Sequence, residues 1–137
     1  MTLNVSEYNN YRQFLSDFYL KKKSEKVGYT YARFAKSAGL GSLNYLKLII
    51  DGTKNITQSN IPRFVKALSL DAQQAEYFEV LVYFNQAKKP LEKDYYQLRL
   101  QKIKKQILAG VHQRTLEEYE FEFLSSWIHQ AIFVLAQ

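Results

Sequence analysis

Side chains suited to contacting phosphates and base edges gather between positions 33 and 55 of this 137-residue chain. Lysine and arginine neutralise phosphates, and asparagine, serine and tyrosine can hydrogen-bond to phosphate oxygens or to bases. If a scaffold presents such a set on one side, we expect it to bind double-stranded DNA. The candidate contact residues are Arg33, Lys36, Ser42, Asn44, Tyr45, Lys47, Lys54 and Asn55.

The sequence offers little for catalysis or for metal binding. It has no cysteine, and its two histidines, His112 and His129, lie 17 positions apart without patterned carboxylates nearby. It contains no glycine-rich phosphate loop and no nucleophile with an identifiable base and orienting partner. We therefore expect no catalytic residue, no metal site and no cofactor, and we do not expect an enzyme.

The elements that must position the candidate residues are predicted to be helices. Only five glycines and two prolines punctuate the chain, and apolar residues at helical spacing fill the intervals between them. The sequence therefore predicts an all-α fold with about seven helices. We expect them at residues 6–26, 31–38, 42–51, 59–68 (or starting near 57), 72–87, 90–110 and 116–136.

Capping residues and glycines outline two short helices joined by a tight turn. Thr30 can cap the first of these helices and Gly39 can end it in the left-handed conformation. Ser42 and Gly52 can play the same two roles for the second helix. Two short helices joined in this way are typical of a helix-turn-helix motif, whose second helix lies in the major groove of DNA.

The helix predicted over residues 42–51 carries leucines on more than one face. Its spacing predicts three core side chains, Leu46, Ile49 and Ile50. Asn44, Lys47 and part of Tyr45 would then face outward, with Leu43 and Leu48 at or near the same surface. These leucines leave a second interpretation open, in which a repurposed helix-turn-helix is a protein-interaction module that pairs with itself or with a full-length relative.

Basic residues are concentrated in the first half of the chain, which has a net charge of +6 overall. Residues 1–70 contain eleven lysines and arginines against four acidic residues, whereas residues 71–137 contain eight against nine. An excess of positive charge suits a polyanionic partner and agrees with DNA as that partner.

A resemblance to a known family is carried by two segments, YARFAKSAGLGSLNYLKLIIDGTKNIT and IPRFVKALSLDAQQAEYFEVLVYFNQAK. They resemble the front half of a poorly characterised bacterial family with many paralogues in predatory bacteria and fibrobacters. Members join an Xre-like helix-turn-helix region to a C-terminal domain of unknown function. The resemblance implies an Xre/lambda-repressor-like bundle and a transcriptional regulator. Members continue beyond the point where this chain stops at Gln137, so we expect most of their C-terminal domain to be absent.

We expect two parts: residues 1–88, an N-terminal helix with the helix-turn-helix subdomain, and residues 89–137, a C-terminal helical extension that packs on it or on a partner. The last predicted helix has two apolar stripes and needs burial on two sides, in the core of its own domain or against another chain. The second possibility predicts a homodimer or heterodimer, whose two copies would bind DNA half-sites about one helical turn apart. Its contact residues would be Tyr119, Phe123, Trp127 and Ile128.

The start of the chain has no basic-then-apolar signal region, and no apolar run is long enough to cross a bilayer. We therefore expect a cytoplasmic protein without a membrane partner.

Overall fold

The structure is a computed structural model that describes residues 3–110. The chain divides into two units, Met1–Lys104 and Lys105–Gln137. Residues 90–104 pack within the first unit: Leu100 and Ile103 are buried, and the ring of Tyr96 lies 5.6 Å from that of Tyr83. The division at residue 88 stays a prediction.

Within residues 3–110 every regular element is a helix and none is a strand, which confirms the predicted all-α fold. The helix predicted at 116–136 lies outside the described residues, as do Tyr119, Phe123, Trp127 and Ile128. The described elements are the 3-10 helices η1 (Val5–Glu7) and η2 (Gln58–Asn60), the helices α1 (Tyr11–Glu25), α2 (Tyr31–Ala38), α3 (Tyr45–Ile50), α4 (Ile61–Leu68) and α5 (Ala72–Gln86), and a helical segment at 90–110.

Several helix ends lie where local signals predict them. The Thr30 hydroxyl accepts a hydrogen bond from the backbone N–H of Arg33 at 3.2 Å, and α2 ends at Gly39 in the left-handed conformation, with φ of 70°. The Asp71 carboxylate likewise accepts from the N–H of Gln74 at 2.8 Å and caps α5. These short-range bonds satisfy backbone donors that a helix start leaves unpaired.

Two predicted helix starts differ from the structure by a few residues. The first helix begins at Tyr11, not near residue 6, because the Asn10 side chain accepts from the N–H groups of Arg12 and Gln13. The fourth helix begins at Ile61 because the 3-10 helix η2 precedes it; the sequence favours Ser59 as its cap, since Pro62 is tolerated only in a first turn, but Asn60 stands at the N-cap position.

The helix predicted over residues 42–51 is also shorter, since α3 spans only Tyr45–Ile50. Leu43 and Asn44 form a turn, closed by the N–H of Tyr45 donating to the Ser42 carbonyl at 3.4 Å. Asn44 therefore stands at the N-cap position in place of Ser42, without a side-chain capping bond.

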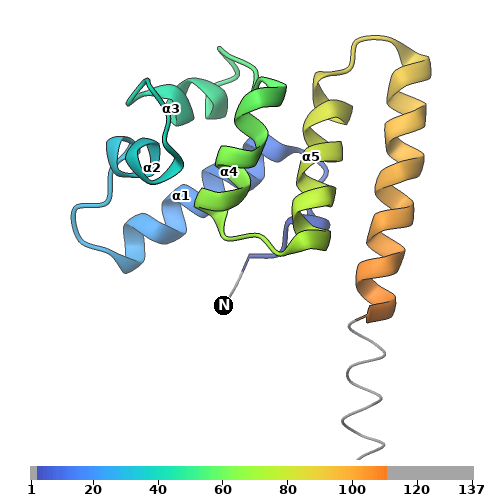
Figure 1. Cartoon of the computed structure of the whole chain (residues 1–137), viewed down its shortest axis with the longest axis horizontal. Coiled ribbons are helices and arrows are strands. Elements are labelled where there is room, and N and C mark those ends of the chain that lie inside the picture. The colour runs from blue at the N-terminus through green and yellow to red at the C-terminus, as the bar shows by residue number, and fades with distance from the viewer. Residues whose placement is uncertain (1–2, 111–137) are drawn as a thin grey trace, which may run out of the picture. The chain divides into compact units, whose positions relative to one another are not determined.

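The core of the first unit joins α2, α3 and α4 to α1. Phe34, Leu46, Ile49 and Phe64 are almost fully buried, and the rings of Phe34 and Phe64 meet at 5.5 Å. The helix pairs that pack include α1 with α3, α2 with α3, and α2 with α4. Figure 1 shows α2 and α3 on one side of α4, with α5 on the other side. This packing holds the α2–α3 pair away from α5.

Gly39→Ala is expected to destabilise the first unit by about 1 kcal/mol, because a left-handed residue with a Cβ is strained. The strain is conformational rather than steric, since an added Cβ would lie 3.6 Å from the Arg63 guanidinium, an ordinary van der Waals contact. Urea denaturation measures the change. The matched control is Gly41→Ala, where a Cβ meets nothing within 4 Å and no positive φ is required. Equal effects of the two substitutions would contradict the role of Gly39.

Candidate nucleic-acid interface

The residues predicted to contact DNA come from α2, α3 and the segments on either side of α3. Arg33 and Lys36 project from α2, Lys47 projects from α3, and all three side chains are exposed. The turn before α3 and the loop after it supply Ser42, Asn44, Lys54 and Asn55, which are all exposed. Tyr45 is the first residue of α3 and is half-buried. Because α2 packs on α3, the basic side chains of the two helices lie on adjacent elements of the structure.

The charge of this region is almost entirely positive. Residues 28–70 contain six lysines and arginines and a single acidic residue, Asp51. Within residues 3–110, Lys21 forms an ion pair with Glu25. The lysines and arginines of α2, α3 and α4 form no ion pair with any residue in this range. An uncompensated positive surface attracts polyanions by long-range electrostatics and by counterion release.

Tyr45 links α3 to the loop that follows it. Its hydroxyl donates to the Asn55 carbonyl at 3.0 Å, and its ring lies against Phe64 with the ring centres 5.9 Å apart. With the hydroxyl proton engaged in this way, Tyr45 positions the loop residues Lys54 and Asn55 relative to α3.

Arg12 is a positioning residue that sequence reasoning missed. From α1, its guanidinium donates to the carbonyls of Ile49 at 2.6 Å and Lys54 at 2.8 Å. It also donates to the Asn55 side-chain oxygen at 2.7 Å. Its planar fork therefore ties the end of α3 and the following loop to α1. The amide nitrogen of Asn55 is the part of that side chain left for an outside ligand.

Two carboxamides at the end of α5 bind backbone groups from distant parts of the chain: Gln86 binds Ile56, in the loop after α3, and Asn85 binds the start of α1. The Gln86 side chain accepts from the N–H of Ile56 at 2.9 Å and donates to its carbonyl at 3.1 Å. It also accepts from the Tyr11 hydroxyl at 2.7 Å. Asn85 accepts from the N–H of Tyr11 at 2.8 Å and donates to the Asn9 carbonyl at 2.9 Å. In the sequence, Asn85 and Gln86 stand out as two polar residues at the otherwise apolar end of α5, which is the only local indication of these contacts.

Tyrosine burial predicts that stability falls at alkaline pH. Burial is the largest cause that raises the pKa of Tyr8 and of Tyr11 to about 12, and for Tyr8 the hydrogen bond to Asp17 adds to it. Unfolded tyrosine titrates near pH 10, so between about pH 10 and pH 12 the folded state holds protons that the unfolded state has lost. Stability is therefore expected to decline across that window. In denaturation at increasing pH, Tyr8→Phe, Tyr11→Phe should flatten the decline, and an unchanged slope would contradict this.

The apolar residues of the α3 region divide between core and surface. Leu46 and Ile49 are fully buried, as the spacing predicts, whereas Ile50 is only half-buried. Leu43 remains 49% exposed in the turn before α3, and Leu48 is half-buried. The surface around Asn44 and Lys47 thus includes an exposed leucine.

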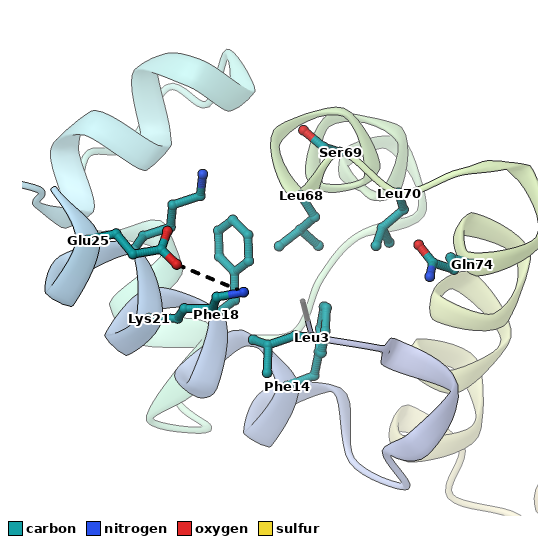
Figure 2. Close-up of a pocket in the computed structure, with 10 residues that line it drawn as sticks. Leu3, Phe14, Phe18, Lys21, Glu25, Leu68, Ser69, Leu70 and Gln74 are labelled. Carbon is teal, nitrogen blue, oxygen red and sulfur yellow. Dashed lines mark ion pairs between the residues drawn. The ribbon is translucent and has the colours of Figure 1, made fainter. Parts of the chain in front are cut away.

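A pocket of about 220 Å³ lies elsewhere, between α1 and the turn that joins α4 to α5 (Figure 2). Phe14, Phe18 and Leu68 line it, and the ion pair of Lys21 with Glu25, at 3.9 Å, lies beside it. Small-molecule sites usually enclose about 300–1,000 Å³, so this pocket is smaller than a typical ligand site.

Among residues 3–110 no group of three or more His, Cys, Asp or Glu side chains is placed to hold a metal ion. No helix in that part of the chain combines the length and apolar character needed to cross a membrane. Comparisons with protein-family models, curated proteins and solved structures found no match.

Proposed function

We propose that this chain binds double-stranded DNA through the α2–α3 face, with α2 and α3 acting as an Xre-like helix-turn-helix, and that it serves as a transcriptional regulator. The observation that carries the proposal is the positive charge of Arg33, Lys36, Lys47 and Lys54 around two packed short helices, which forms no ion pair within residues 3–110. Lysine and arginine would fix the protein on phosphates.

Base contacts would come from the segment before and along α3. Asn44 and Lys47 are exposed there, and their side chains have the donors and acceptors that purine edges match in the major groove. Ser42 adds a hydroxyl at the start of the turn. Arg12, Gln86 and Tyr45 would act behind this surface, because they hold α3 and the following loop in one geometry.

Nuclear magnetic resonance of the full chain tests where DNA binds. Titrating a short duplex into 15N-labelled protein should shift the amide signals of α2, of α3 and of Lys54. Signals of helix 90–104, which lies beyond α5 from α3 in Figure 1, should stay nearly constant. Shifts confined to helix 90–104 would contradict the proposed face.

A second candidate function is protein binding by the same turn and helix. The observation in its favour is Leu43, which is 49% exposed beside half-buried Leu48. The chain would then pair with itself or with a longer relative. The duplex titration separates the two functions, because a protein-binding module would show no amide shifts on α2 or α3 when DNA is added.

A further inference from the structure

Three large apolar side chains are exposed in one stripe of helix 90–104, the part of the helical segment 90–110 that lies in the first unit. Leu91 is 82% exposed, Tyr95 56% and Leu98 67%. Their spacing of four and then three residues places them on one side of the helix. We call these three residues the outer stripe.

The outer stripe is not the face by which the helix packs on its own unit. That face carries Leu100 and Ile103, which are 7% and 3% exposed, and half-buried Tyr96. The helix is therefore apolar on two opposite sides, of which one is covered. Exposed apolar residues elsewhere in the first unit, such as Leu20 and Leu43, stand singly on different elements, as is ordinary for a protein surface. A contiguous stripe on one helix is typical of an interaction site.

The charges beside the outer stripe indicate that its partner is an antiparallel copy of the same helix. Glu92 and Asp94 lie in the first half of the helix, and Arg99 and Lys102 lie in the second. Lys93 is also in the first half, but helical spacing places it on the side away from the outer stripe. Two copies related by a two-fold axis between Tyr95 and Leu98 would oppose acidic and basic halves. A parallel pair would place like charges together.

Pairing about this axis would also match the side chains in detail. Tyr95 of one copy would face Leu98 of the other, and Glu92 would lie near Arg99 of the other. Glu92 and Arg99 are seven residues apart and therefore lie on the same flank of the stripe. In an antiparallel pair, the same flank of each helix faces the other copy, so the two residues can meet. The Arg99 guanidinium already lies over the Tyr95 ring, 5.8 Å from its centre, so part of the contact surface is ordered within one copy.

We infer that two copies of this chain associate through the outer stripe in an antiparallel, two-fold pair. A segment of fifteen residues is about 22 Å long, and one helix stripe covers less than the roughly 800 Å² per partner of a standard interface. The dimer is therefore weak, with a dissociation constant of about 10–100 µM. This inference does not depend on DNA binding.

Sedimentation velocity of the full chain, over about 5–200 µM, tests the dimer. The wild-type protein is expected to shift from monomer to dimer across this range. Leu98→Glu should weaken the dimer at least about tenfold, because the substitution buries a carboxylate in the contact. The matched control, Leu20→Glu, changes an exposed leucine of α1 and should leave dimerisation unchanged. Both positions are exposed, so circular dichroism should show both variants folded.

A charge exchange tests the antiparallel arrangement. Glu92→Arg alone and Arg99→Glu alone should each weaken the dimer, and the double variant should restore it, since both pairs of opposite charges are rebuilt. Three results would overturn the inference: a wild-type monomer at every concentration, a dimer that tolerates Leu98→Glu, or a double variant no better than the two single ones.

Discussion

Replacing Arg12 with leucine is expected to lower the free energy of unfolding by about 2–4 kcal/mol. The guanidinium donates to the carbonyls of Ile49 and Lys54 and to the Asn55 side chain, all within 2.8 Å. Hydrogen bonds from a charged group contribute about 1.5–3 kcal/mol each, and their loss leaves acceptors without a partner. The effects are not additive, so the expected total is below the sum of three bonds.

Urea denaturation measures this loss, and two control variants interpret it. Arg12→Lys keeps the charge but loses the planar fork, so we expect a loss between those of wild type and Arg12→Leu. Lys66→Leu removes an exposed cation from α4 and should change stability by less than about 0.5 kcal/mol. If Arg12→Leu cost no more than Lys66→Leu, Arg12 would not hold α3 and its loop in place.

Lys47→Glu, Lys54→Glu is expected to weaken binding to duplex DNA by about 100-fold at low salt. Both lysines are exposed, one on α3 and one in the loop after it, and neither forms an ion pair in the described part of the chain. Reversing two phosphate contacts should also reduce the slope of log K against log salt by about two. Fluorescence anisotropy with a labelled duplex measures both quantities.

The control for this pair is Lys93→Glu, Lys104→Glu, which makes the same change in net charge. Both residues are exposed on helix 90–104, on the far side of α5 from α3 in Figure 1. We expect this control to weaken binding by less than about tenfold, through long-range charge alone. Equal losses for the two variants would mean that net charge, and not the α2–α3 face, determines binding.

Local signals allowed α2 and much of the candidate surface to be predicted from the sequence. The Thr30 cap and the left-handed Gly39 act within a few residues, so both ends of α2 were predicted correctly. The exposure of Lys47 likewise follows from helical spacing, since Leu46 and Ile49 face the core, whereas Asn44 is exposed in the turn before α3. The start of α3 was wrong because a serine before a helix and a serine before a turn look alike in sequence.

The contacts that hold the candidate surface together could not be predicted. Arg12 reaches carbonyls 37 and 42 positions away, and Gln86 pairs with the backbone of Ile56, 30 positions away. Nothing in the local sequence identifies a carbonyl acceptor so distant along the chain. A polar residue at the end of an apolar helix, such as Gln86, predicts that a contact of this kind exists, but it does not identify the residue contacted. The outer stripe was missed for a related reason, because helical spacing gives two apolar faces and does not say which one is covered.

The most direct test of DNA binding by the α2–α3 face is the salt dependence of wild-type affinity. Anisotropy with random and genomic duplexes, at about 50–200 mM salt, should give log K falling linearly and steeply with log salt. Tight binding at low salt that weakens in this way would support phosphate contacts, and a smaller slope in Lys47→Glu, Lys54→Glu than in Lys93→Glu, Lys104→Glu would place them on the α2–α3 face. No binding to any duplex at the lowest salt would contradict the proposed function.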